Sequence, residues 1–116
     1  MKVFISQPMK GLTDQEIKEI RSKAIIELGK HFEEFDTIDS FIEGKPPKNV
    51  NEAIWYLGKS IEKLAEADLV LFLPGWHETR GCNVEYEATL RYHIKKAYMR
   101  FDYVGNLKLD MDEEEV

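Results

Sequence analysis

Glu85 is the residue whose type and place in the sequence best suit covalent chemistry. It follows Gly81 by four positions, in a segment that reads GCNVEYE. If a helix begins at Cys82 or Asn83, Glu85 lies in the first turn, where the helix dipole and free N–H groups favour an ionised carboxylate. Such a carboxylate at the rim of a pocket can attack an electrophilic carbon, as in glycosyl transfer. Glu85 is therefore the candidate nucleophile.

A second acidic residue, Glu87, lies close to Glu85 in the sequence. Because it follows Glu85 by two positions, it points to nearly the opposite side of a helix, and only one of the two can face a pocket. The alternative interpretation is that both are first-turn acids that complement the helix dipole and do no chemistry. The residue pattern alone leaves both interpretations open.

The loop before this helix, Gly75–Gly81, carries side chains that suit a planar or anionic ligand. Trp76 could stack on a base or a sugar face, or it could cover the edge of the core. His77 titrates near neutral pH and could give a proton to a leaving base, although a lone loop histidine is often merely exposed. Arg80 could face an anion or could be an ordinary surface charge. The candidate binding residues of this loop are Gly75, Trp76, Arg80 and Gly81, and His77 is the candidate acid.

An earlier loop, Gln7–Leu12, reads QPMKGL and contains a proline and a glycine. Lys10 could contact a phosphate group, although such a lysine is more often solvated. The segment matches neither the Walker A pattern nor the GxGxxG fingerprint, so we predict no ATP or NAD site. The residues expected to line the same crevice are Ser6, Gln7, Met9, Lys10 and Gly11.

Composition and charge exclude several classes of function. The 116 residues suit a single soluble domain, and the formal net charge of −6 argues against a sequence-independent grip on nucleic acid. The three histidines are scattered, and there is no HExxH motif and no Cys–His cluster, so we predict no metal and no other cofactor. We therefore expect a small-molecule ligand, with neither a nucleic acid nor a membrane as partner.

The single cysteine and the N-terminus bear on the compartment. Cys82 has no intramolecular partner, which fits a reducing environment, and a lone cysteine is usually a small buried hydrophobic residue. The apolar run that follows Lys2 is ended by Ser6 and Gln7, too early for a signal peptide. No run is long enough for a transmembrane span, so we expect a cytoplasmic protein.

The elements that must position these residues alternate between strand and helix. Strands are expected over residues 1–6, 35–41, 69–73 and 98–104. Helices are expected from a capping box at Thr13 to about His31, from a cap at Asn51 through Leu64, and from about Asn83 to about Lys96. The run Leu69–Leu73 shows no alternation, so it should be buried on both faces at the centre of a parallel sheet.

This alternation predicts an α/β domain over residues 1–106, with a small parallel sheet of about four strands and helices on both faces. Residues 107–116 are expected to form an acidic tail. In such sheets ligands bind beyond the carboxyl ends of the strands. The two loops should therefore meet around one pocket.

Two segments carry a family resemblance. They read KVFISQPMKGL from Lys2 and ADLVLFLPGWHETRGCNVE from Ala67. Together they are similar to the nucleoside 2-deoxyribosyltransferase-like superfamily, and within it to a group of small bacterial and phage proteins with S-x-P-M-x-G and P-G-W…G…E motifs. The similarity covers most of Met1–Ala97. It implies a flavodoxin-like three-layer sandwich with a pocket for a nucleoside or its 5′-phosphate.

The resemblance also implies a mechanism. In characterised relatives a glutamate at the position of Glu85 attacks the anomeric carbon, and a glycosyl-enzyme forms while an acid helps the base to leave. A second base or water then takes the sugar, which gives a deoxyribosyltransferase or an N-glycoside hydrolase. In hydrolase relatives the first loop holds the 5′-phosphate, which here would involve Ser6 and Met9–Gly11. Neighbouring subunits complete the pocket in relatives, so we expect a homo-oligomer.

The chain departs from the superfamily pattern at two acidic positions. Active transferases carry an aspartate in the helix before the central strand, and the match here falls at Ser60. The pocket aspartate after that strand is replaced by Gly75-Trp76-His77, so leaving-group protonation falls to His77, Glu78 or the substrate. Loss of a general acid costs about a hundredfold to ten-thousandfold in rate. The alternative function is therefore a nucleotide-binding module without turnover.

Overall fold

The computed structural model describes residues 1–39 and 42–111. Its elements, in chain order, are β1 (Lys2–Ser6), α1 (Asp14–Gly29), β2 (Asp36–Thr37), α2 (Glu52–Leu64), β3 (Leu69–Phe72), a 3₁₀ turn η1 (Trp76–Glu78), α3 (Arg80–Arg91), β4 (Lys95–Phe101) and β5 (Leu107–Met111). No helix within these residues has both the length and the apolar character needed to cross a membrane.

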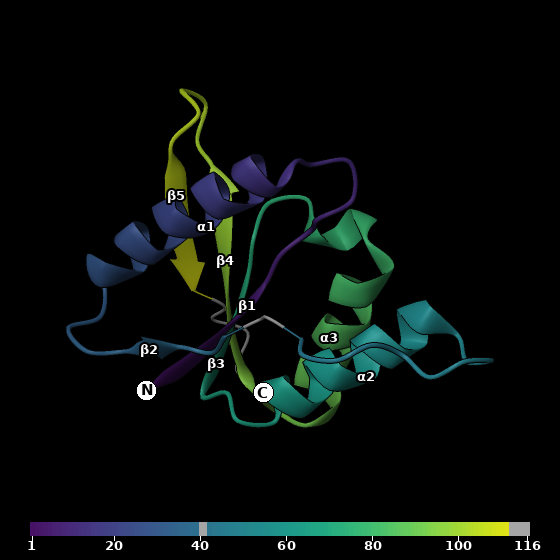
Figure 1. The fold of residues 1–116 in the computed structure, drawn as a ribbon. Helices are drawn as coiled ribbons and strands as arrows, with labels where there is room; N and C mark the ends of the chain where they lie inside the picture. Colours follow the sequence, from purple (N-terminus) through teal and green to yellow (C-terminus); the bar gives the residue numbers. More distant parts are fainter. Residues whose placement is uncertain (40–41, 112–116) are drawn as a thin grey trace.

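The strands form one sheet in the order β2-β1-β3-β4-β5. The first four strands are parallel, and β5 runs antiparallel to β4. Helix α1 covers one face of the sheet, and α2 and α3 lie on the other (Figure 1). The predicted α/β sandwich is therefore confirmed, with the strand order of flavodoxin-like folds. The sheet has five strands rather than about four.

The core lies on both faces of the central strand. Strand β3 is fully buried between β1 and β4, as its unbroken apolar run predicts. Ala24 and Leu28 of α1 pack against the face that holds Leu71. Leu64 of α2 packs against the opposite face, beside Phe72.

The first two helices begin where the sequence predicts. The hydroxyl of Thr13 accepts the Glu16 N–H at 3.1 Å, and the Glu16 carboxylate accepts the Thr13 N–H at 2.9 Å, which together form the capping box. Helix α2 is capped by the Asn51 side chain, which accepts the Ile54 N–H at 3.0 Å. Helix α1 ends at Gly29, two residues before His31.

The third helix and the strand after it differ from the predicted bounds. Helix α3 begins at Arg80 rather than near Asn83, because the η1 turn places Thr79 at the helix start. It ends at Arg91 rather than near Lys96. His93 adopts a left-handed conformation with φ of 54°, which is incompatible with continued helix. Strand β4 consequently begins at Lys95, three residues earlier than predicted.

Two further segments differ from expectation. The expected strand over residues 35–41 is reduced to the two residues of β2, and residues 40–41 lie outside the described part of the chain. Residues 107–111, expected to begin an acidic tail, form β5 instead. Leu107 is buried, and Leu109 alternates with Lys108 and Asp110 along the strand, so one face packs toward α1. Residues 112–116 lie outside the described residues.

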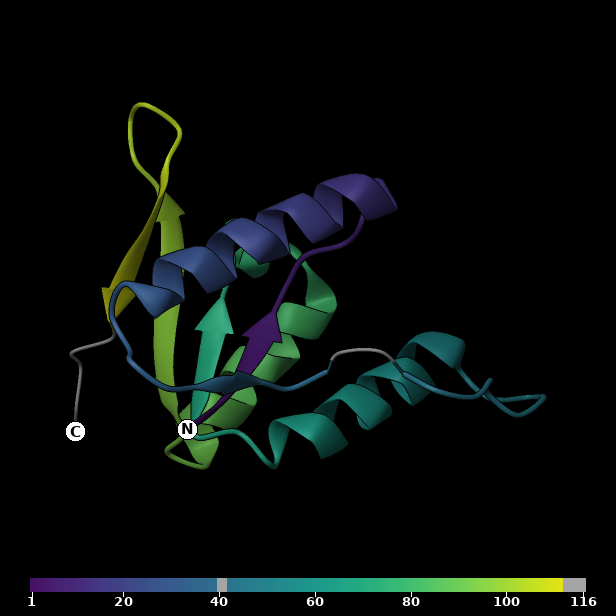
Figure 2. The same ribbon diagram turned by 60° about the vertical axis from the view of Figure 1, so that its left-hand side comes forward.

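The connection between β4 and β5 is a tight hairpin. The Asp102 carboxylate accepts the N–H groups of Val104 and Asn106, at 3.0 and 2.9 Å. Figure 2 shows this hairpin projecting beyond the body of the molecule, while α2 and the loop before it extend in a different direction.

Candidate functional site

The site lies at the carboxyl ends of β1 and β3. The chain leaves β1 toward β2 on one side of the sheet, whereas β3 lies on the other side of β1, so the strand order reverses between β1 and β3. In open α/β sheets this switch point is where ligands bind. The backbone N–H of Leu73 donates to the Ser6 carbonyl at 3.0 Å, which holds the two strand ends together.

The two loops that the sequence analysis singled out meet at this edge. Gly75 adopts φ of +84°, a left-handed conformation that glycine adopts without strain. A Cβ atom added to Gly75 would lie 3.8 Å from Cγ of Pro8 in the first loop. The loop after β1 and the turn after β3 are therefore in contact range, as the parallel sheet predicts.

Glu85 is buried and both of its carboxylate oxygens accept hydrogen bonds. Its residue exposure is 6%. The Ser6 hydroxyl donates to Oε1 at 2.7 Å, and the Ser60 hydroxyl donates to Oε2 at 2.7 Å. Two hydroxyl donors on one carboxyl group suit the ionised form, which only accepts hydrogen bonds. The site thus holds a buried carboxyl group in a fixed orientation.

Burial and hydrogen bonding act on Glu85 in opposite directions. Burial raises the pKa of Glu85 above its ordinary value, and the hydrogen bonds from Ser6 and Ser60 lower it. We expected the first turn of a helix to stabilise the charge, but α3 begins at Arg80 and Glu85 lies beyond its first turn. The helix dipole acts mainly within that turn, so the serine hydroxyls replace it as the source of stabilisation.

The neighbouring glutamate is directed elsewhere. Glu87 is exposed, and its Oε1 lies 2.7 Å from Nε of Arg91 one turn later on α3. As expected from their spacing, the two carboxylates point to different sides of α3, Glu85 inward and Glu87 to the surface, and whether Glu85 faces a pocket stays a prediction. Glu87 is consequently a matched control for substitutions at Glu85.

Cys82 lies one turn before Glu85 and is buried, with 5% exposure. Burial raises the pKa of the Cys82 thiol, and hydrogen bonds with the Ser6 and Thr79 side chains lower it. A thiol whose pKa is raised by burial is a poor nucleophile, because the thiolate is the reactive form. Cys82 therefore packs as a small hydrophobic residue, as predicted, against the same serine that binds Glu85.

Trp76 belongs to an aromatic cluster at the edge of the core. Its ring centroid lies 4.7 Å from that of Tyr86, 5.1 Å from Phe72 and 5.9 Å from Tyr98. The ring is partly buried against the face of the sheet that carries α2 and α3. This placement favours the interpretation that Trp76 covers the core edge, and stacking on a ligand stays a prediction for its exposed part.

His77 and Arg80 are both exposed, His77 in the η1 turn and Arg80 at the first position of α3. Nε2 of His77 lies 3.9 Å from Oε1 of Glu78, and its ring stands edge-on to Trp76 at 5.7 Å. The structure thus directs His77 toward Glu78. Arg80 opens α3, whose first turn contains no acidic residue. The roles of His77 as an acid and Arg80 as an anion contact remain predictions.

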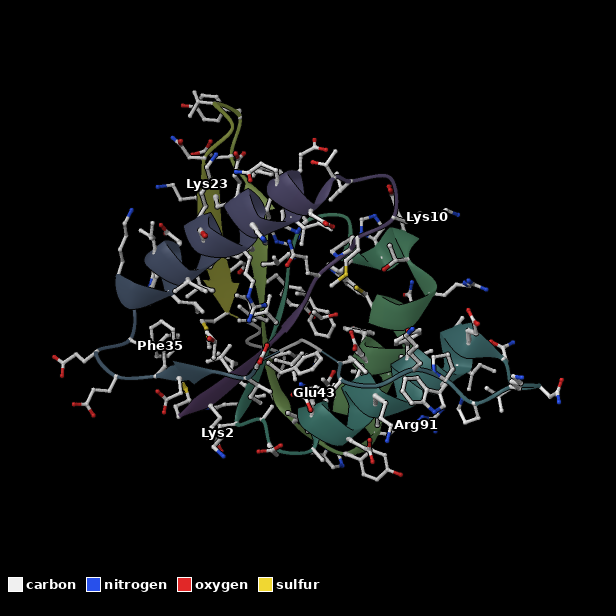
Figure 3. All side chains as sticks on the ribbon, viewed as in Figure 1. Lys2, Lys10, Lys23, Phe35, Glu43 and Arg91 are labelled. Carbon is white, nitrogen blue, oxygen red and sulfur yellow. The ribbon has the colours of Figure 1, made fainter. Side chains whose placement is uncertain are left out.

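The first loop divides into a buried and an exposed part. Gln7 is buried, and its side-chain amide donates to the Ile17 carbonyl at 2.8 Å, which ties the loop to α1. Met9, Lys10 and Gly11 are exposed. Figure 3 labels Lys10 on the loop between β1 and α1. Phosphate binding by this loop stays a prediction.

Ser60 is the site residue that the sequence analysis did not include. It lies three positions after Leu57, whose Cδ1 would be 4.0 Å from a Cβ atom at Gly81, so both face α3. Because Ser60 follows Leu57 by three positions, helical spacing places the two on the same face of α2, and this spacing could have marked Ser60 as a site residue. The superfamily resemblance also pointed to position 60, but only as a place where active transferases have an aspartate and this chain does not.

Two shallow hollows of about 420 and 320 Å³ lie beside the start of β1 and β2, at the opposite edge of the sheet from Ser6. Their acidic residues, such as Glu33 and Asp36, are exposed. Over residues 1–39 and 42–111, no three His, Cys, Asp or Glu side chains gather as metal ligands would.

Comparisons with known proteins place this site within a family domain. A family model described as "Domain of unknown function (DUF4406)" matches residues 1–98, so the chain belongs to the DUF4406 family. The matched residues include both loops, Ser60 and Glu85. No curated protein and no solved structure gives a significant match to the chain.

Proposed function

We propose that this DUF4406 protein cleaves or exchanges the N-glycosidic bond of a nucleoside or nucleotide, with Glu85 as the nucleophile. The observation that carries the proposal is the buried Glu85 carboxylate, held by Ser6 and Ser60 at the switch point of the sheet. A desolvated and oriented carboxylate is what attack on a sugar carbon requires. The resemblance to nucleoside 2-deoxyribosyltransferase-like proteins supports the same assignment.

In the first step, an oxygen of Glu85 attacks C1′ of the sugar. A C–O bond forms to the enzyme while the C1′–N bond breaks, and the departing base keeps that electron pair and takes up a proton. The product is an ester between the sugar and Glu85. The hydrogen bond from Ser6 or Ser60 to the other carboxylate oxygen persists through this step and holds the side chain in place.

In the second step, the ester is resolved by attack on C1′ from a new nucleophile. Water gives a free sugar and a hydrolase, whereas the nitrogen of another base gives a new nucleoside and a transferase. In either reaction the C1′–O bond to Glu85 breaks with its electrons returning to the carboxylate. The incoming nucleophile loses one proton, which balances the proton taken by the first base.

The source of the first proton decides between catalysis and simple binding. The hydrogen-bond partners of Glu85 in the described part of the chain are two serines, not a second carboxyl group. We assign the acid role to His77, which must turn from Glu78 toward the substrate. The second candidate function, a nucleotide-binding module without turnover, is favoured by this same lack of an acid beside Glu85.

Substrate contacts are proposed for the residues at the carboxyl ends of β1 and β3. We assign the sugar and its 5′ end to the first loop, through Ser6, Met9, Lys10 and Gly11. The base is assigned to the exposed part of Trp76 and to the backbone near Gly75. Arg80 and Gly81 at the start of α3 would face anionic groups. Buried Gln7 would shape the loop through its bond to Ile17.

We further propose that the protein acts as a cytoplasmic homo-oligomer. In this proposal a neighbouring subunit completes the pocket at the loops after β1 and β3. Trp55 and Tyr56 lie on α2 with ring centroids 5.1 Å apart, and Tyr56 is 42% exposed. This pair gives the subunit an apolar contact surface on the helix that also carries Ser60.

The test is to incubate the protein with a panel of nucleosides and 5′-monophosphates and to measure free base by chromatography. Wild type should release base from at least one member, Glu85→Gln should release none, and Glu87→Gln should match wild type. The same panel is screened for thermal stabilisation of all three proteins. Release that persists in Glu85→Gln would rule out Glu85 as nucleophile. Stabilisation of wild type without base release would favour the binding module.

A further inference from the structure

We propose that Ser60 is a positioning residue for Glu85: its hydroxyl favours the ionised form of the buried carboxyl group and fixes the orientation of that group at the carboxyl ends of β1 and β3. The inference rests on the proposed function. The superfamily resemblance treats position 60 only as a place where an aspartate is missing, whereas the inference gives Ser60 itself a role. Ser60 acts through Glu85, by a hydrogen bond of 2.7 Å to Oε2.

The contact joins three elements at one carboxyl group. Ser6 comes from the end of β1, Glu85 from α3, and Ser60 from α2. With Oε1 bound to Ser6 and Oε2 bound to Ser60, rotation of the carboxylate plane breaks at least one hydrogen bond. Each carboxylate oxygen can accept a further interaction, so the orientation is fixed without blocking attack on a substrate.

The energetic reason for Ser60 is the burial of the charge. A carboxylate removed from water is disfavoured unless hydrogen-bond donors replace its hydration. Glu85 is nine-tenths buried or more, and among the described residues 1–39 and 42–111 the groups that satisfy it are neutral hydroxyls rather than a cation. Removing one donor leaves an acceptor of the charged form unsatisfied, which favours protonation of Glu85. A protonated carboxyl group is a poor nucleophile.

Ser60 can be tested more cleanly than Ser6. The Ser6 backbone is part of the sheet and its side chain also contacts Cys82, so its substitution changes more than one interaction. Ser60 is partly buried on α2, and its hydroxyl bond to Glu85 is the side-chain hydrogen bond that it donates. Alanine at this position removes little beyond that bond.

The groups that act on the titration of Glu85 come from α3, β1 and α2. Cys82 on α3 interacts electrostatically with Glu85, while β1 and α2 contribute the uncharged Ser6 and Ser60. Burial raises the pKa of Cys82, so its thiol stays uncharged while a carboxyl group titrates in the acidic range. A change in Glu85 titration on substitution of Ser60 can therefore be attributed to the lost hydroxyl.

The decisive experiment is a ¹³C NMR pH titration of the Glu85 side-chain carboxyl in the full chain. Ser60→Ala should move the Glu85 titration to higher pH, and Ser60→Thr, which keeps a hydroxyl, should return it toward wild type. Ser22→Ala is the matched control, because it removes an exposed helical serine from α1. An unchanged Glu85 titration in Ser60→Ala would overturn the proposal.

Kinetics supply the second readout and separate this inference from the proposed function. In Ser60→Ala, kcat for base release at neutral pH should fall about tenfold to a hundredfold with little change in KM, and the acid limb of the pH profile should move to higher pH. If Glu85→Gln abolishes turnover but Ser60→Ala changes neither kcat nor the pH profile, only the role of Ser60 fails. If wild type releases no base, the glycosidic function fails and the NMR titration still decides whether Ser60 controls Glu85.

Discussion

The hydroxyl of Ser6 lies 2.7 Å from Oε1 of Glu85, although 79 positions separate the two residues in the chain. The contact joins the last residue of β1 to the middle of α3. It forms because β1 and β3 are parallel neighbours, so the loop after β3 brings α3 back beside the end of β1. This hydrogen bond therefore depends on the sheet topology, and it brings two residues of the candidate site together.

Stability should depend on pH through Glu85. Burial raises the pKa of Glu85 in the folded chain, so its contribution to stability is fully present below the unfolded pKa and is lost as pH rises through the folded value. Wild type should therefore lose stability relative to Glu85→Gln as pH rises from about 4, the unfolded value, through the raised folded pKa. Thermal unfolding of the two proteins across this range measures the difference.

The control for this pH dependence is Glu87→Gln, which removes an exposed carboxylate from the same helix. Its difference from wild type should stay small across the range, because surface ion pairs contribute little. A difference between wild type and Glu85→Gln that does not change with pH would mean that Glu85 titrates alike in the folded and unfolded chains.

Two glycine substitutions should have effects of opposite sign. Gly75→Ala places a side chain at φ of +84°, which should lower the free energy of unfolding by about 1–2 kcal/mol. Gly58 lies within α2 with no atom within 4 Å of an added Cβ, so Gly58→Ala should raise it by about 0.5–1 kcal/mol. Urea denaturation measures both. A neutral Gly75→Ala would show that the turn after β3 accommodates a side chain at position 75 without strain.

Substitutions of Trp76 should distinguish a structural ring from a ligand contact. Because the ring packs on Phe72 and Tyr86, Trp76→Ala should lower the free energy of unfolding by about 2–4 kcal/mol, and Trp76→Phe by less. If Trp76 also stacks on the base, Trp76→Phe should raise KM in a protein that remains folded. Urea denaturation and kinetics on the same samples separate the two effects. An unchanged KM would leave Trp76 with the core role alone.

The acid role of His77 predicts a dependence on the leaving group. His77→Gln should slow release of a natural base about a hundredfold, because an amide cannot donate a proton as an acid does. Release of a leaving group that is stable as an anion, such as p-nitrophenolate, should change little. Glu78→Gln is the control, because it removes the carboxylate that His77 faces and leaves the imidazole in place. Equal slowing for both leaving groups would contradict the acid role.

The layers of the fold could be predicted because short local patterns in the sequence specify the helix starts and the central strand. The Thr13–Glu16 capping box, the Asn51 cap and the apolar run at Leu69–Leu73 each act within a few residues, and each is found where predicted. The left-handed turn at His93 has no such local signature, so the end of α3 was placed too late. Strand β5 was missed because its acidic neighbours masked the alternation of Leu107 and Leu109.

The candidate site was predictable in outline but not in its contacts. Parallel strands require the loops after β1 and β3 to meet, and this brought Pro8 and Gly75 together as expected. The bond between Ser60 and Glu85 depends instead on how α2 packs against α3, which no pattern in either helix specifies. The stabilisation of Glu85 was consequently assigned to the helix dipole, whereas the structure assigns it to two serines.

The measurement that tests the account most directly is the mass of the intact protein after incubation with a 2′-fluorinated nucleoside that is found to release its base. Fluorine beside C1′ slows resolution of the ester, so a glycosyl-enzyme should accumulate. We predict a mass increase of one fluorosugar on the peptide that contains Glu85, present in Glu87→Gln and absent from Glu85→Gln. Base release with no adduct, or an adduct on another residue, would contradict the assignment of Glu85 as the nucleophile.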